Sequence, residues 1–164
     1  MKFGSGISAA AFGMLLLLVG SVPALAQEDD RHVGYYYPEP QTTETYVARV
    51  TALPDSDRNR RIAFVTGLTK QMLAGQYEPS YAVFAKGDEA EKLIIVGLVD
   101  GQLNTIYRAR ALLAELTAVA RLTPFFQQNT LAEQATFLDL LKLLGFVQLT
   151  ISDGDKFAHQ IAIQ

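Results

Sequence analysis

The pattern of hydrophobic and polar positions after residue 44 predicts both helices and strands. Apolar residues recur at helical spacing over about 56–74, 106–121 and 130–144. Apolar residues that alternate with polar ones, or follow one another without a break, predict strands over 46–53, 81–85, 93–99, 147–152 and 157–163. The folded part of the chain is therefore expected to begin with a strand and to end with a hairpin.

The order of these segments is strand, helix, strand, strand, helix, helix, strand, strand, which predicts an α+β fold. We expect a two-layer sandwich, in which three helices cover one face of an antiparallel or mixed sheet of about five strands. The segment 93–99 is apolar at both parities, which is typical of a strand buried on both faces. It should therefore lie inside the sheet and not at an edge.

Polar side chains and glycines mark the ends of the predicted helices. Residues able to cap the first two helices are Asp55, Ser56 or Asp57, and Asn104 or Thr105. Thr130-Leu131-Ala132-Glu133 has the spacing of a capping box, in which the threonine and glutamate side chains each accept a backbone N–H. Gly145 is a typical helix stop. The third helix is therefore expected between this box and Gly145.

The register of the last hairpin can be predicted from the side chains that it would bury. A three-residue loop, Ser152-Asp153-Gly154, would pair Ile151 with Asp155, Leu149 with Phe157 and Val147 with His159. One face is then apolar and the other polar, whereas a two-residue turn would mix both faces. Because burial of one face fixes the register, we predict the three-residue loop, with His159 on the apolar face.

The first 26 residues have the layout of a signal peptide. Lys2 gives a positive start, residues 9–22 are almost wholly apolar, and Ala24-Leu25-Ala26 forms an A-x-A cleavage site. The apolar stretch is shorter than the roughly 20 residues that span a bilayer, so cleavage after Ala26 is favoured over an uncleaved anchor. Residue 27 is glutamine and not cysteine, which excludes a lipid-anchored lipoprotein. We expect a periplasmic protein with no stable membrane span after cleavage.

Residues 27–44 are polar and contain prolines, which predicts an extended N-terminal arm ahead of one domain over 45–164. The arm carries Tyr35, Tyr36 and Tyr37 in a row. Such a cluster is too apolar to remain in water. It either packs on the domain or contacts a partner, since tyrosine is enriched at protein interfaces.

Composition excludes several classes of function. The chain has 164 residues, of which 49% are hydrophobic and 19% charged, so disorder along its whole length is excluded. Its net charge of −3 disfavours nucleic-acid binding. There is no cysteine, which excludes disulfides and thiol catalysis, and two histidines are too few for a multi-histidine metal site. We predict neither a metal site nor a cofactor.

Outside the arm, the candidates for chemistry or binding are a histidine and two groups of arginines. His159 is the single catalytic candidate, and the signal for it is weak. Its alternative role is that of a hydrogen-bonded histidine of the core. Arg58, Arg60 and Arg61 begin the first helix and Arg108 and Arg110 begin the second. These arginines form either an anion or acidic-partner site built from two helix starts, or a solvated, salt-paired surface. Neither a phosphate-binding glycine loop nor a G-x-S-x-G motif is present.

Several segments together resemble a known family. They are Gly34-Tyr35-Tyr36-Tyr37-Pro38, the stretches 61–69, 81–87 and 106–113, Thr123-Pro124-Phe125-Phe126 and the stretch 152–159. From His32 onward the chain resembles a family of short exported proteins from Gram-negative bacteria, whose members often carry the label molybdopterin-guanine dinucleotide biosynthesis protein A. The nucleotidyltransferases of that name have a glycine-rich loop after their first strand. This chain has no such loop near its expected mature start, so the resemblance transfers no catalytic residue.

These observations favour a small exported binding or accessory protein without catalysis. Its expected contacts with a periplasmic protein partner are Tyr35, Tyr36, Tyr37, Arg108 and Arg110. The alternative is an enzyme or cofactor-handling protein with a site near His159. The hairpin edges and the arm are also compatible with a homodimer.

Overall fold

The computed structural model describes residues 37–123, 126 and 134–164, which belong to a compact unit of residues 31–164. The predicted signal peptide, Tyr35, Tyr36 and the predicted capping box at Thr130–Glu133 lie outside the described residues. Tyr37 lies within them and is half-buried.

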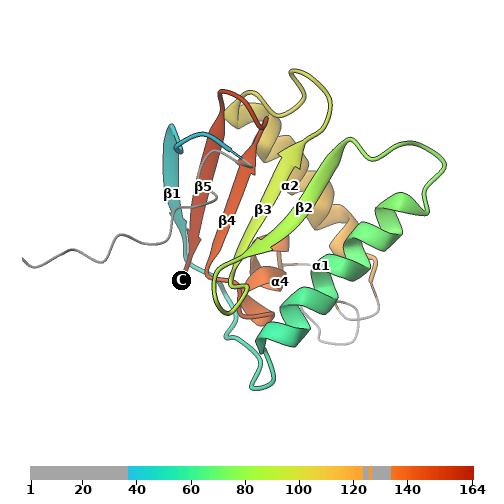
Figure 1. Cartoon of the computed structure of the whole chain (residues 1–164). Helices are drawn as coiled ribbons and strands as arrows, with labels where there is room; N and C mark the ends of the chain where they lie inside the picture. The colour runs from blue at the N-terminus through green and yellow to red at the C-terminus, as the bar shows by residue number, and fades with distance from the viewer. Residues whose placement is uncertain (1–36, 124–125, 127–133) are drawn as a thin grey trace, which may run out of the picture. The chain divides into compact units, whose positions relative to one another are not determined.

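The described elements follow one another in the predicted order (Figure 1). They are β1 (Thr42–Tyr46), α1 (Arg58–Leu73), β2 (Tyr81–Lys86), β3 (Lys92–Gly97), α2 (Ile106–Arg121), α4 (Phe137–Leu143), β4 (Gln148–Ser152) and β5 (Ala158–Ile163). The α+β class is confirmed. The predicted first and second helices are also confirmed, and Asp57 and Thr105 are their N-caps.

The five strands form one mixed, open sheet in the order β1-β5-β4-β3-β2. β2 and β3 are antiparallel, as are β4 and β5, whereas β3 pairs with β4 and β1 pairs with β5 in parallel. β3 therefore has a neighbour on each side. Leu93, Ile94 and Ile95 are at most 1% exposed, which confirms that this strand is buried on both faces.

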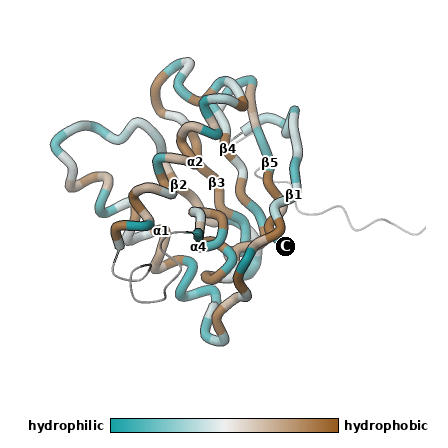
Figure 2. Tube along the Cα trace, turned by 180° about the vertical axis from the view of Figure 1, so that it is seen from behind, coloured by the Kyte–Doolittle hydropathy of each residue, from teal (hydrophilic) through white to brown (hydrophobic). Residues whose placement is uncertain are grey.

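The hydrophobic core lies between the sheet and its helices. Figures 1 and 2 show α2 and α4 on the same side of the sheet, and α1 packs beside β2 against the same core. Alternate strand residues point into this layer and meet leucines of α2 and α4. Buried aliphatic contributors include Leu93, Ile95, Leu112, Leu116, Leu141, Leu149, Ile151 and Ile161. Burying apolar area of this kind is the main force that holds the two layers together.

The first strand differs from the prediction. It was expected over 46–53, whereas β1 is Thr42–Tyr46 and begins inside the segment assigned to the arm. β1 pairs with β5 from Thr42↔His159 to Tyr46↔Ile163. Its sequence, Thr-Thr-Glu-Thr-Tyr, carries little apolar signal, and only the distant partner strand makes it a strand. After β1 the chain turns away, and the Arg49 N–H donates to the carboxylate of Asp139.

The last hairpin has the predicted faces but a different register. Ile151 lies opposite His159 and not Asp155, and Leu149 lies opposite Ile161 and not Phe157. The prediction of a three-residue loop was therefore wrong. Because the shift is an even number of residues, every side chain keeps its face, and His159 lies on the apolar side as expected.

Two side chains build the longer loop. Asp153 Oδ1 accepts hydrogen bonds from the N–H groups of Asp155, Lys156 and Phe157 at 2.9, 2.9 and 2.8 Å. Ser152 Oγ donates to the Phe157 carbonyl at 2.7 Å and accepts from the Gly154 N–H at 2.9 Å. Burial raises the pKa of Asp153, but these N–H donors hold it below its ordinary value. The loop is therefore organised around an ionised aspartate.

Replacing Asp153 by alanine is expected to lower the free energy of unfolding by about 1–2 kcal/mol, because three backbone N–H groups lose their acceptor. Urea unfolding followed by circular dichroism measures this change. The control is Asp155→Ala, which removes only an exposed carboxylate paired with Lys156 and should change stability by less than about 0.5 kcal/mol. Equal effects of the two substitutions would contradict the role given to Asp153.

The start of α4 also differs from the prediction. The helix was expected from Thr130, whereas Ala135 lies outside it and Thr136 is its N-cap. Thr136 and Asp139 form a capping box, which has the T-x-x-[D/E] spacing but uses aspartate. The predicted stop is confirmed. Gly145 has φ +80°, and its N–H donates to the Lys142 carbonyl while that of Phe146 donates to Leu141.

Candidate functional site

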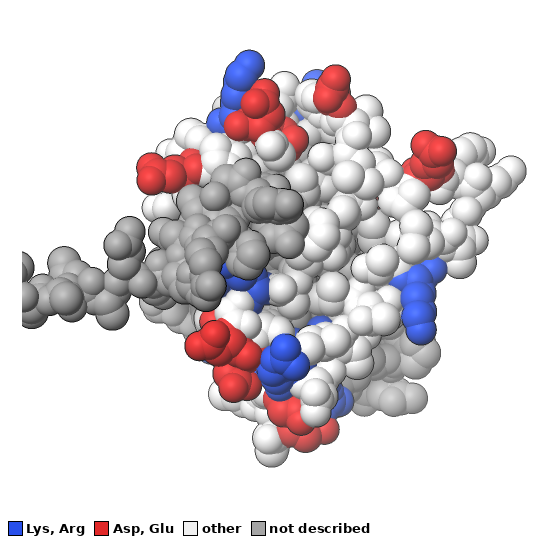
Figure 3. All heavy atoms as spheres, in the orientation of Figure 1, with Lys and Arg blue, Asp and Glu red and all other residues white. Residues whose placement is uncertain are grey.

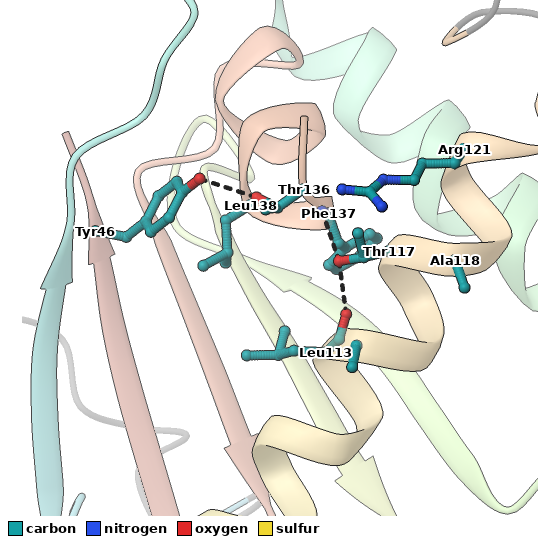
Figure 4. A pocket seen from close by; sticks show the side chains of 9 residues that line it. Tyr46, Leu113, Thr117, Ala118, Arg121, Thr136, Phe137 and Leu138 are labelled. Atoms are coloured by element: carbon teal, nitrogen blue, oxygen red, sulfur yellow. Dashed lines mark hydrogen bonds between the residues drawn. The ribbon is translucent and has the colours of Figure 1, made fainter. Parts of the chain in front are cut away.

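A cavity of about 390 Å³ lies between β1, α2 and α4 (Figure 4). Its walls are mainly aliphatic and aromatic, with three hydroxyl groups and one guanidinium among them. The lining residues are Tyr46, Leu113, Ala114, Thr117, Ala118, Arg121, Thr136, Phe137 and Leu138. Its volume falls in the range of small-molecule sites, and mostly apolar walls with a few fixed polar groups are typical of them.

One end of the cavity is fixed by a buried carboxylate. Asp139 is fully buried, and its Oδ2 accepts from the Tyr46 hydroxyl at 2.9 Å and from the Thr136 N–H and hydroxyl at 2.8 and 3.0 Å. Its Oδ1 accepts from the Arg49 N–H at 2.9 Å. Burial raises the pKa of Asp139, but these hydrogen bonds hold it below its ordinary value. The carboxylate is thus ionised at neutral pH, and both of its oxygens accept hydrogen bonds from the protein.

Tyr46 is held as a neutral phenol at this end. Burial raises the pKa of its hydroxyl above the ordinary value, and the nearby Asp139 carboxylate adds to the effect. The hydroxyl oxygen lies 3.0 Å from Thr136 Oγ1, and Figure 4 shows the ring reaching toward the start of α4. Tyr46 therefore joins the edge strand to α4 across the cavity.

Hydrogen bonds between α2 and α4 fix the opposite wall. Thr117 Oγ1 donates to the Leu113 carbonyl at 2.7 Å and accepts from the Phe137 N–H at 3.0 Å. Arg121 Nε donates to the Ala135 carbonyl at 3.1 Å. In Figure 4 the Arg121 guanidinium extends from α2 toward the first residues of α4. These contacts place a positive charge at the rim of the cavity.

The structure does not bring Arg108 and Arg110, the two arginines predicted to contact a partner, together. Arg110 Nη2 lies 3.1 Å from Glu44 Oε2 on the edge strand. Arg108 lies on another side of α2, where it lines a shallow hollow with Gln102, Leu103 and Glu115, among others. A single anion site made of both side chains is therefore not formed within this chain.

His159 lies in a hydrogen-bonded cluster that the sequence did not reveal. The side chain is 1% exposed. Its Nδ1 lies 2.8 Å from Thr42 Oγ1, and its Nε2 lies 3.2 Å from Glu44 Oε1. Burial raises the pKa of Glu44, but the hydrogen bonds from His159 and Arg110 and the positive charge of Arg110 hold it below its ordinary value. His159 is thus a satisfied buried histidine with a hydroxyl on one side and a carboxylate on the other.

Sequence analysis missed Tyr46 and Arg121 as site residues, and it missed the partners of His159. Tyr46, Thr42 and Glu44 all belong to β1, whose position was predicted wrongly. The Thr136-x-x-Asp139 spacing was the one available signal for the polar end of the cavity. Arg121 carries no local signal, because its role depends on the packing of α2 against α4.

Charged side chains of both signs lie around the margin of the face that Figure 3 shows. These are lysine, arginine and acidic side chains, and few charges lie among the described atoms at the centre of this face.

Within the described ranges, no three His, Asp or Glu side chains are placed to hold a metal ion. In the same part of the chain no helix has the length and apolar character needed to cross a membrane.

Comparison of the chain with protein-family models, with curated proteins and with solved structures gives no match. The family resemblance drawn from the sequence therefore stays a prediction, and the site must be interpreted from its own geometry.

Proposed function

We propose that the chain is an exported binding or accessory protein whose ligand occupies the cavity between β1, α2 and α4. The observation that carries this proposal is the cavity itself, with apolar walls and polar groups locked in place by Asp139, Thr117 and Ala135. No histidine or acidic side chain is among the described residues that line it. We therefore assign the cavity to binding and not to catalysis.

The lining residues favour a small amphipathic ligand with one anionic end. Leu113, Leu138 and Phe137 offer apolar contacts, and Arg121 is the one charged side chain among the described lining residues. Asp139 is not among the described lining residues, and its oxygens accept hydrogen bonds from protein donors instead of facing a ligand. A guanidinium is well suited to pair with a carboxylate or sulfonate.

Export and a protein partner form the second part of the proposal. They are supported by the signal-peptide layout of residues 1–26 and by the tyrosines at 35–37. A ligand-binding domain with an aromatic arm is a suitable accessory subunit. The arm, with the exposed Arg108, would contact the partner.

The cavity is tested with anilinonaphthalene sulfonate, an aromatic dye with one anionic group. Titration of residues 27–164 is expected to give a saturable rise in fluorescence with about one dye per chain. Ala118→Phe, which fills the cavity from an exposed position of α2, should weaken binding more than about tenfold, or about 1.4 kcal/mol. Arg121→Gln should weaken it by a similar factor, because the sulfonate loses its cation.

The matched control is Ala111→Phe, an exposed alanine of α2 that is not among the lining residues of the cavity. It should leave dye affinity within about twofold of the unsubstituted protein, well below 1 kcal/mol. If all three variants bind the dye equally, the dye binds elsewhere and the cavity is not the binding site. Circular dichroism checks that each variant is folded.

A further inference from the structure

Thr42, His159 and Glu44 form a line of hydrogen bonds at the edge of the sheet, away from the cavity. The parallel register of β1 and β5 produces this arrangement, because Thr42 lies directly opposite His159 and Glu44 lies two residues further along β1. Strand residues two apart share a face. The histidine ring is therefore placed between a hydroxyl and a carboxylate, at 2.8 and 3.2 Å.

The charge of Glu44 decides which ring nitrogen of His159 carries hydrogen. The pKa of Glu44 is held below its ordinary value, so at neutral pH this side chain is a carboxylate that only accepts hydrogen bonds. In the neutral form of His159, which is the form that can act as a base, the ring hydrogen on Nε2 is donated to Glu44. Nδ1 is left with a lone pair and accepts the hydroxyl proton of Thr42.

This is the geometry of an activated hydroxyl: a nucleophile within hydrogen-bond reach of a base, and a third group that orients the base. Arg110, 3.1 Å from the second oxygen of Glu44, holds the orienting carboxylate in turn. The base is 1% exposed, whereas Thr42 lies at the surface. Reagents in solution can therefore reach the hydroxyl while His159 stays sheltered.

A polar hollow lies at the end of the sheet next to Gln41, although Thr42 itself is not among its described lining residues. The hollow has a volume of about 570 Å³ and is lined by Gln41 and Phe157, among others. Gln41 directly precedes Thr42, and its side-chain oxygen accepts from the Ala158 N–H at 2.7 Å. Phe157 lies two residues before His159.

We propose that Thr42 is a reactive hydroxyl that accepts an acyl group from an activated ester, with His159 as its general base. Thr42 Oγ1 attacks the ester carbonyl carbon, and its proton passes to His159 Nδ1. The new bond joins Oγ1 to the acyl carbon, and the bond from that carbon to the leaving alkoxide or phenoxide breaks. His159 then gives the proton to the leaving group, so the products are acyl-Thr42 and a free alcohol or phenol.

This inference goes beyond ligand binding in the cavity and does not depend on it. None of the three residues lines the cavity. It gives the enzyme alternative of the sequence analysis a defined nucleophile, base and orienting group.

The test uses p-nitrophenyl acetate on residues 27–164, with peptide mass spectrometry to locate the acetyl group. Thr43 is the internal control, because it is an exposed threonine of the same strand on the opposite face from His159. Thr42 is expected to be acetylated about 100-fold faster than Thr43, since a positioned general base contributes roughly that factor. Equal rates at the two threonines in the folded protein would overturn the proposal.

Two variants assign the effect to the base. His159→Gln can still hydrogen-bond to both neighbours but cannot take the proton, so acetylation of Thr42 should fall about 100-fold. Thr42→Ser should keep the reaction, and Thr42→Val should abolish it. If folded His159→Gln reacts at the unsubstituted rate, the proposal is wrong. If that variant does not fold, the ratio of Thr42 to Thr43 acetylation in the unsubstituted protein decides.

Discussion

Replacing Asp139 by alanine should lower the free energy of unfolding by about 4 kcal/mol. Each hydrogen bond to a charged group contributes about 1.5–3 kcal/mol, and removing the acceptor leaves buried donors without a partner. Asp139 accepts from the N–H and hydroxyl of Thr136, the N-cap of α4, and from the Tyr46 hydroxyl and the Arg49 N–H at the end of β1. Urea unfolding at neutral pH measures the loss.

Asp139→Asn separates charge from shape. The amide keeps one oxygen acceptor but turns its NH₂ group toward donors of the protein, so the loss should lie between zero and that of the alanine variant. A variant as stable as the unsubstituted protein would show that the carboxylate does not connect β1 to α4. Asp139→Ala should also weaken binding of the dye in the cavity, because the hydrogen bonds that fix the Tyr46 and Thr136 side chains are lost.

The same carboxylate predicts how stability depends on pH. Its pKa in the folded protein lies below the ordinary value of about 3.9. The unfolded chain therefore binds the proton more tightly, and the contribution is complete above the ordinary value and lost as pH falls through the folded value. Glu44 and Asp153 act in the same direction. Asp139→Asn should reduce the difference in stability between pH 7 and about pH 3.

Replacing Arg61 by methionine should lower the free energy of unfolding by about 3 kcal/mol. The side chain is 5% exposed, although it belongs to a helix whose other residues are at least partly exposed. Its Nε donates to the Glu89 carbonyl at 2.8 Å and its Nη1 to the Ser56 carbonyl at 2.9 Å. Methionine keeps much of the aliphatic packing, but it leaves these carbonyl groups without their donor.

Arg61 also supports the end of α4. Nη1 lies 3.4 Å from the carbonyl oxygens of Leu144 and Gly145, where the helix leaves its last carbonyl groups unpaired. One guanidinium thus connects the start of α1, the β2–β3 loop and the end of α4. Thermal or urea unfolding should show a single cooperative loss in Arg61→Met.

The neighbouring arginine is the matched control. Arg60 pairs with Asp55 at the surface, where its side chain is 34% exposed and that of Asp55 is 73% exposed. Exposed pairs contribute about 0–1 kcal/mol, so Arg60→Met should have less than about a third of the effect of Arg61→Met. Equal losses would mean that the polar contacts of Arg61 contribute no more than an exposed surface pair.

The parts of the fold that could be predicted have strong local signals. The β2–β3 hairpin, α1 and α2 each combine a clear apolar period with a capping residue or a polar loop. β1 has none of this, since four of its five residues are polar and its partner follows more than 100 residues later. β1 is a strand because it pairs with β5, and no local sequence pattern predicts that pairing.

The residues of the His159 cluster and of the cavity could be predicted only where they have local sequence signals of this kind. His159 was found because burial fixes the face of β5, but Thr42 and Glu44 reach it through the strand that was misplaced. The hairpin register depended on one carboxylate that organises five residues, and turn preferences alone do not contain it. The cavity needs β1, α2 and α4 together, so its composition becomes visible only after all three are packed.

The parallel pairing of β1 with β5 has a consequence for the order of folding. Contacts between residues far apart in sequence form late, because a long loop must close first. A chain that emerges N-terminus first, from a ribosome or a translocation channel, carries an unpaired β1 until β5 has followed. Tyr46, Thr42 and Glu44 then reach their partners together, so the last step of assembly both closes the edge of the sheet and completes the two clusters built on it.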